Sequence, residues 1–306
     1  MKKYLLFGNR IVASFFILTT LSVVFFPQTN YIRDIQDYLV HFMLMLILSG
    51  IIGLIIGNRT VLFTSFGCAG ILALFLKNAS NDNLKNPTIN QQIKVSIAHI
   101  NLAAVSDVEN FWNILKDSTI DAVIVYEYTP DWDKVLKVIS KNYKPYYSTY
   151  TKDDVYGKAI FSAYPILNTD TILYDKNPNL QCLISKNSAE FNILSTYITP
   201  SLSTSSSNTS SQELSTIANH LIYKQSHTIV SGEFNQVYWS FDVMNFRTKT
   251  NLQNSRRSIN PSSLKMPYQH IFYSHDLECT MFEDLFENKT TDIGCKGTYQ
   301  IKDTYI

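Results

Sequence analysis

The stretch SHTIVSGEFNQVYWS, residues 226–240, decides how this sequence is interpreted. It predicts a short apolar strand over residues 228–230, a tight turn at Gly232, and then two polar side chains, Glu233 and Asn235. Side chains alternate along an extended chain, so these two side chains point to the same side. A carboxylate and an amide oxygen at a strand end are hard ligands that suit Mg²⁺. On its own the stretch equally fits a hairpin with a surface acid, and the rest of the chain must decide between the two.

The composition combines an apolar first quarter with an ordinary globular remainder. Of 306 residues, 45% are hydrophobic and 17% are charged, and the net charge is +1. A nucleic-acid partner is not supported, because there is no basic excess to neutralise phosphates. The four cysteines form no CxxC or Cys/His pattern, so we expect no structural zinc site. Cys279 and Cys295 could form a disulfide outside the cytoplasm.

Three apolar segments predict a three-helix transmembrane anchor over residues 1–77, followed by a polar linker over residues 78–93. The segments are residues 11–26, 38–57 and 61–76. A spanning helix needs about 20 apolar residues. The second segment is long enough, and the other two can extend into flanking residues. No signal-peptide cleavage site follows the first segment.

The basic residues around these segments predict the orientation of the anchor. Lys2, Lys3 and Arg10 precede the first span, and Arg59 lies in the short turn between the second and third spans. Short loops rich in Lys and Arg stay in the cytoplasm. We therefore expect a cytoplasmic N-terminus, three spans, and a soluble domain on the extracytoplasmic side.

Residues 94–306 predict an α+β domain with two packed, mostly antiparallel sheets and helices outside them. The candidate strands besides the opening stretch are residues 93–100, 121–126, 146–151, 157–163, 169–174, 180–185, 190–198, 269–273 and 298–302. The candidate helices are residues 108–115, 130–140, 213–223 and 241–246. Residues 201–211 are almost all Ser, Thr and Asn, which predicts a flexible surface loop whose role stays open.

The order of the landmarks in this domain resembles the endonuclease/exonuclease/phosphatase family, which has the DNase I-like fold. The landmarks are AHIN ending at Asn101, IVYEYTPDW around Glu127, GKAIFSAYPI at 157–166, TYITP at 196–200, VSGEFNQVYWS at 230–240 and PYQHIFYS at 267–274. No single landmark is specific, but together they cover residues 94–303. The resemblance implies a four-layer DNase I-like sandwich, here in a membrane-anchored member.

The resemblance also implies metal-assisted phosphoester hydrolysis and suggests which residues would carry it. Asn101 matches a family amide and Glu127 the family's metal-binding carboxylate. Glu233 stands where the family has Asp, while Asn235 and His270 match a family Asn and His. The implied cofactor is Mg²⁺ or Mn²⁺, held by Glu127 and, as further candidates, by Glu233 and Asn235.

Other positions depart from the family pattern, and the departures concern the catalytic base. Tyr197 stands in place of a family His, and Gln269 in place of an Asp. The family's terminal Ser-Asp-His falls near residues 294–297, where there is no Asp-His pair. The pair His275-Asp276 is a poor substitute, because it lies at the wrong end of a predicted strand.

Three hypotheses follow, and whether the protein is an enzyme stays undecided at this point. We favour the first, a degenerate family member with impaired catalysis that acts as a membrane-tethered binding module. The second is an active Mg²⁺-dependent phosphoesterase with a rearranged site, acting on a phosphorylated lipid or a small phosphoester such as a nucleotide. The third is a membrane protein whose soluble domain is structural. The sequence names no protein partner.

Overall fold

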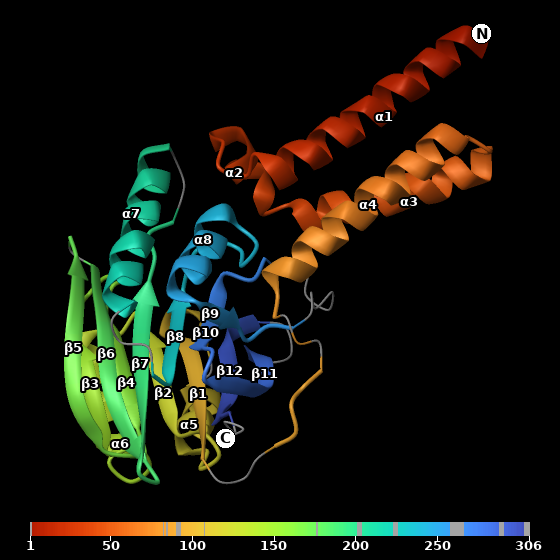
Figure 1. The fold of residues 1–306 in the computed structure, drawn as a ribbon. Helices are drawn as coiled ribbons and strands as arrows, with labels where there is room; N and C mark the ends of the chain where they lie inside the picture. Colours follow the sequence, from red (N-terminus) through yellow and green to blue (C-terminus); the bar gives the residue numbers. More distant parts are fainter. Residues whose placement is uncertain are drawn as a thin grey trace.

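The computed structural model describes residues 2–302 except residues 82, 84, 90–92, 107, 176, 201–203, 223–225, 258–265 and 288–290. Three long helices form the N-terminal quarter and extend away from the globular part (Figure 1). They are α1 (Lys2–Phe25), α3 (Leu39–Ile56) and α4 (Arg59–Ala79). Each helix contains a segment long and apolar enough to cross a membrane. The three predicted apolar segments are therefore confirmed as helices of spanning length and composition.

A short helix, α2 (Asn30–Gln36), lies between the first two long helices and was not predicted. It lies at the end of the helices next to the globular part (Figure 1). The turn between α3 and α4 lies at the opposite end, where Gly57 adopts a left-handed conformation with φ of 74°. Asn58 then caps α4, accepting a hydrogen bond from the Val61 N–H at 3.3 Å.

The globular part contains two mixed sheets of six strands each. The first sheet has the order β11-β12-β1-β2-β4-β3 and the second the order β5-β6-β7-β8-β10-β9. The strands of the first sheet are β1 (Lys94–Asn101), β2 (Ala122–Tyr126), β3 (Tyr146–Tyr150), β4 (Lys158–Ser162), β11 (Leu277–Glu287) and β12 (Thr291–Ile301). Those of the second are β5 (Ile166–Tyr174), β6 (Asn177–Lys186), β7 (Ala189–Tyr197), β8 (Thr228–Glu233), β9 (Leu252–Asn254) and β10 (Gln269–Ser274). Within the described residues, the pairs β1–β2 and β7–β8 are parallel and the other pairs are antiparallel.

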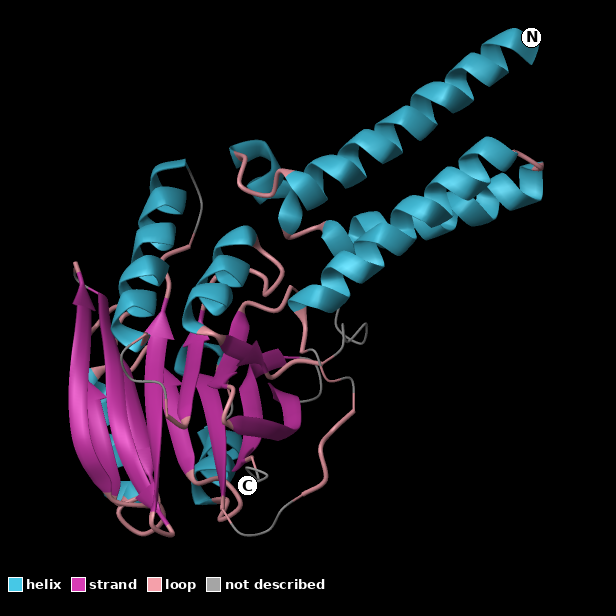
Figure 2. Cartoon of the chain, in the orientation of Figure 1, coloured by secondary structure: helices cyan, strands magenta, loops and turns pink. Residues whose placement is uncertain are grey.

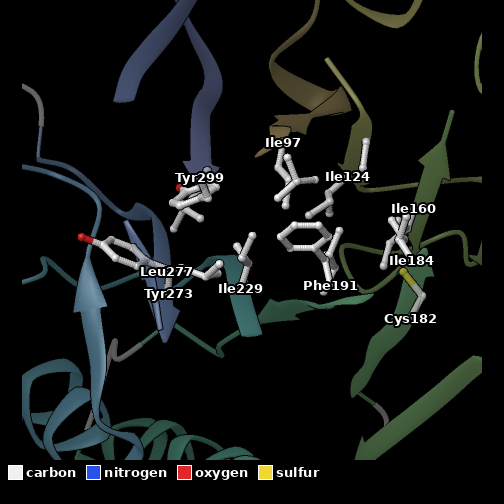
Figure 3. Packing of buried hydrophobic residues seen from close by; sticks show 14 of the residues in the cluster. Ile97, Ile124, Ile160, Cys182, Ile184, Phe191, Ile229, Tyr273, Leu277 and Tyr299 are labelled. Atoms are coloured by element: carbon white, nitrogen blue, oxygen red, sulfur yellow. The ribbon is translucent and has the colours of Figure 1, made fainter. Parts of the chain in front are cut away.

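Helices cover the outer faces of the two sheets and make a four-layer sandwich (Figure 2). The helices are α5 (Val108–Lys116), α6 (Pro130–Ser140), α7 (Thr204–Leu221) and α8 (Phe241–Thr250). A buried cluster of Ile, Phe and Tyr side chains fills the space between the sheets, with Phe191 at its centre in Figure 3. Separate apolar clusters join the first sheet to α5 and α6, and the second sheet to α7 and α8. The predicted α+β class and four-layer arrangement are confirmed.

Two local predictions were wrong, and one open question is answered. Gly232 lies inside β8 rather than in a turn. A Cβ atom at this position would lie 2.4 Å from the Thr196 carbonyl oxygen, so the strand needs a glycine there. The predicted loop over residues 201–211 is helical from Thr204, where α7 begins. Whether Cys279 and Cys295 form a disulfide was left open by the sequence, and both are free and buried, on β11 and β12.

Candidate functional site

The predicted polar residues lie at one edge of the two sheets, because parallel strands end together. Asn101 ends β1, and Glu127 follows β2, its parallel neighbour. In the second sheet Tyr197 ends β7 and pairs with Glu233, which ends β8. Gln269 begins β10 on the other side of Glu233. Strands from both sheets thus deliver polar side chains to one place.

The side-chain amide of Asn101 joins the two sheets at this edge. Its Nδ2 atom donates to Glu127 Oε1 at 3.2 Å and to Glu233 Oε2 at 3.4 Å. Its Oδ1 atom accepts a hydrogen bond from the Ala103 N–H at 2.9 Å, which fixes the orientation of the amide. Glu127 adopts a left-handed backbone conformation with φ of 55°, which is uncommon for a non-glycine residue. Such strain often accompanies a functional position.

Two carboxylates share this site without a basic partner. Within the described ranges, neither Glu127 nor Glu233 forms an ion pair with Lys, Arg or His. Gln269 Nε2 donates to Glu233 Oε2 at 3.4 Å. The pKa of Glu233 is raised by burial, and the nearby charges of Glu127 and Asp292 raise it further. The site therefore favours a positive ligand.

Tyr197 and Asn235 form the adjoining part of the site. The Asn235 Nδ2 atom donates to the carbonyl oxygen of Ile198, the residue after Tyr197, at 2.8 Å. The Tyr197 ring packs edge-on against Tyr156, with 5.5 Å between ring centroids. Burial raises the pKa of Tyr197 to about 12, so its hydroxyl stays protonated near neutral pH.

His270 lies outside this group of residues. It follows Gln269 on β10, so strand alternation turns its side chain to the opposite face. Its Nε2 atom is 2.8 Å from the Gln236 carbonyl oxygen, and the ring packs against Phe234 and Phe272. Burial lowers its pKa to about 3. His270 is therefore a neutral core side chain.

The structure adds Asp292, which the sequence reasoning missed. Gly294 pairs with Ile100 near the end of β1, so Asp292 lies at the N-terminal end of β12, next to the site. The Asp292 Oδ1 atom accepts a hydrogen bond from the Gly294 N–H at 3.2 Å. Residues 294–297, where the terminal family motif was placed, instead pair with the interior of β1. A Thr-Asp pair at the start of the strand was the available signal.

A second histidine, His99, lies between the sheets and also went unnoticed. Its Nδ1 atom is 3.2 Å from Ser231 Oγ, and its ring packs at a tilt against Tyr126 with 4.4 Å between ring centroids. Burial lowers its pKa to about 3. An imidazole with such a pKa does not accept a proton near neutral pH. His99 therefore joins His270 as a structural histidine.

The donor set offers limited means of holding a metal ion. Among the described residues, no group of three His, Cys, Asp or Glu side chains could hold one. Glu127 and Glu233 nevertheless converge on one point, the Nδ2 atom of Asn101. Mg²⁺ is commonly held by one or two carboxylates together with ligand phosphates and water. The pair fits that mode of binding.

Comparisons with known proteins were made in sequence and in structure. In sequence, no family model and none of the curated proteins matches the chain. In structure it is similar to an endonuclease/exonuclease/phosphatase family protein from Bacteroides thetaiotaomicron, with a TM-score of 0.53 and 13% identity over 68% of this chain and 98% of that chain. It is also similar to the human Nocturnin catalytic domain with bound sulfate, with a TM-score of 0.56 and 14% identity over 70% and 97% of the two chains.

A third similar structure is a mannosyl-6-phosphatase from Bacteroides thetaiotaomicron, with a TM-score of 0.52 and 13% identity over 68% of this chain and all of that chain (100%). At such identities a structural likeness concerns the fold, because one fold hosts many functions. The chain therefore has the fold of the endonuclease/exonuclease/phosphatase family, preceded by three helices able to cross a membrane.

Proposed function

We propose that this protein is a membrane-anchored endonuclease/exonuclease/phosphatase-like protein that binds a phosphoester without hydrolysing it. The supporting observation is that the described site contains no imidazole. Among the described residues, the two histidines within strands, His99 and His270, are buried with pKa values of about 3. Hydrolysis needs a group that takes a proton from water near neutral pH. Tyr197, with a pKa of about 12, does not supply one.

The binding function rests on the carboxylate pair. Glu127 and Glu233 would hold Mg²⁺ or Mn²⁺, and the cation would supply the charge that attracts a phosphate. Asn101 holds the two carboxylates in register, and the protonated Tyr197 hydroxyl can donate a hydrogen bond to a phosphate. Without a cation the acidic site would repel a phosphate. Binding should therefore depend on the divalent cation.

The second hypothesis, an active phosphoesterase, is supported by the same contact between Asn101, Glu127 and Glu233. A site that holds a metal and orients its substrate can retain activity without a base. The mannosyl-6-phosphatase among the similar structures acts on a phosphoester by its name. The structural-protein hypothesis lacks such support, since it leaves the uncompensated carboxylate pair without a role.

For the membrane part, we propose three spans over residues 1–77, a linker over 78–93 and the globular domain over 94–306. Since α2 and the globular part lie at the same end of the helices, three crossings place them on the same side (Figure 1). The basic residues predict a cytoplasmic N-terminus and an extracytoplasmic domain. Cysteine labelling from outside intact cells, at residues introduced in α2 and at Asn58, would test this topology.

Hydrolysis assays test the proposed function. The full chain in nanodiscs is incubated with Mg²⁺ or Mn²⁺ and with generic phosphodiesters and phosphomonoesters. We expect no turnover above that of the variant Glu127→Ala. Metal-dependent turnover that Glu127→Ala abolishes would instead establish the active phosphoesterase. A metal-induced increase in thermal stability, absent from Glu127→Ala, is the expected sign of cation binding.

A further inference from the structure

The globular domain is bound to the loop between the first two spans. Arg33 Nη2 lies 2.7 Å from Asp242 Oδ1, and these side chains are only 18% and 6% exposed. Trp239 Nε1 donates to the Gln36 carbonyl oxygen at 2.7 Å, and the Phe241 N–H donates to Gln36 Oε1 at 3.1 Å. Ion pairs and hydrogen bonds that are buried in this way fix the relative position of two parts.

A second set of contacts binds the domain to the end of the third span. Asn81, two residues beyond α4, is completely buried, and its Nδ2 atom donates to the Tyr273 hydroxyl and the Asn254 carbonyl oxygen, each at 2.6 Å. Arg247 donates to the Ala79 carbonyl oxygen. An apolar cluster closes the junction, and Trp239 packs in it with residues of the spans. The domain is thus held in one orientation by contacts on both sides of the junction.

The contact with α2 is made by the segment that also builds the candidate site. Tyr268 donates its hydroxyl hydrogen to Asp37 Oδ2 at 3.0 Å, and its carbonyl oxygen accepts from the Phe234 N–H at 2.8 Å. Phe234 follows Glu233 directly, and Tyr268 precedes Gln269. One tyrosine therefore links the membrane loop to β8 and β10, two of the strands that build the site, and the site lies on the membrane side of the domain.

Exposed aromatic residues mark the level of the bilayer surface at this loop. Tyr31 is 84% exposed and Tyr38 is 58% exposed, although both are large and partly apolar. Tyrosine is enriched where membrane headgroups meet water. The headgroups therefore lie at the level of α2, next to the segment that carries the candidate site.

We propose that the ligand of the candidate site is the phosphodiester headgroup of a phospholipid in the membrane that carries the chain. This inference rests on the proposed function and names its ligand class. The fixed orientation presents the site to headgroups at an effective concentration in the millimolar range, as for other tethered pairs. At such a concentration, a weak site with two carboxylates and one cation is sufficient to bind a headgroup. A soluble phosphoester would gain nothing from this orientation.

Photocrosslinking in nanodiscs of phosphatidylcholine and phosphatidylglycerol tests the proposal with the full chain and millimolar Mg²⁺. p-Benzoylphenylalanine replaces either Gln269, at the site, or Ser188, in the turn before β7 at the opposite end of the sheets. We expect roughly tenfold more lipid adduct at position 269, a ratio that corresponds to about 1.4 kcal/mol. The double variant Glu127→Gln, Glu233→Gln should lose this excess. The matched variant Glu190→Gln, exposed at the opposite end, should keep it.

Three results would overturn the proposal. Equal adduct at positions 269 and 188 would show that lipid does not reach the site. Adduct that the double variant leaves unchanged would show mere proximity to the bilayer. Loss of adduct on adding micromolar glycerophosphocholine would place the ligand in the aqueous phase. Release of phosphate or alcohol in the same nanodiscs reports separately on hydrolysis, so a failure of the proposed function is distinguishable. Tryptophan fluorescence confirms that each variant is folded.

Discussion

Replacing Glu233 by Gln should stabilise the protein, because the site holds two carboxylates that repel each other. Glu127 Oε1 and Glu233 Oε2 lie 3.2 and 3.4 Å from the same Asn101 nitrogen, so they are separated by no more than the sum of these distances. At an effective dielectric constant of about 20, the repulsion is on the order of 2 kcal/mol. The amide oxygen of Gln can still accept the bonds from Asn101 and Gln269. We expect Glu233→Gln to gain about 1–2 kcal/mol at neutral pH.

The pH dependence gives this prediction its sign. The pKa of Glu233 is raised in the folded state, so the folded protein binds more protons and the wild type loses stability as pH rises from about 4.5. The Glu233→Gln variant has no such loss, so its stability advantage over the wild type should grow as the pH rises above about 4.5. Millimolar Mg²⁺ should remove most of this advantage: at ten times its dissociation constant it would stabilise the wild type by about 1.4 kcal/mol and leave the variant nearly unchanged.

Thermal unfolding followed by tryptophan fluorescence measures both effects, because Trp112, Trp132 and Trp239 all lie in the globular part. For a domain of this size, about 1 kcal/mol shifts Tm by roughly 2–4 °C. The matched variant Glu190→Gln should change neither Tm nor its response to Mg²⁺. A Glu233→Gln protein less stable than the wild type, or an advantage independent of pH, would refute the reasoning.

Three further predictions concern the junction, the cysteines and the missing base. Arg33→Ala leaves Asp242 buried without its partner and should cost about 3–5 kcal/mol, seen as faster hydrogen exchange in α2, whereas Lys134→Ala, from an exposed pair, should not change that exchange. Cys182, Cys279 and Cys295 are buried and free, so thiol reagents should modify them only after denaturation, and modification of the native protein would contradict their burial. The triple variant Tyr197→His, Gln269→Asp, Ile293→His introduces imidazoles at Tyr197 and at the residue that follows Asp292, and it should raise metal-dependent hydrolysis above background by about 10²-fold; no gain in a folded variant would show that more than the base is missing.

Much of the fold could be predicted because the strands that build the site are simple apolar runs. The runs ending at Asn101 and Glu127 mark two parallel strands, and parallel strands end at the same edge of a sheet. The meeting of Asn101 with Glu127 follows from this, whereas its contact with Glu233 depends on how the second sheet packs on the first. The fold class needed only the order of such runs, which the resemblance to a known family supplied.

Other features depend on contacts that local sequence does not encode. Strand β12 looked short because Gly294 weakens strand propensity, yet a Cβ there would lie 1.9 Å from the His99 carbonyl oxygen. The predicted strand was therefore too short to include Asp292. His270 matched a family position, but alternation along β10 turns it away from Glu233. The docking of Arg33 on Asp242 joins residues 209 positions apart, a separation no local pattern reveals.

A single-turnover experiment tests the central claim most directly, that the site binds a phosphoester and does not hydrolyse it. Excess full-length protein in nanodiscs is mixed with Mg²⁺ and a labelled phospholipid, and adduct formation and headgroup release are measured in the same sample. The account predicts lipid adduct at position 269 and no release above that of the Glu127→Gln, Glu233→Gln variant. Release of the labelled headgroup that requires Mg²⁺ and Glu127 would contradict it.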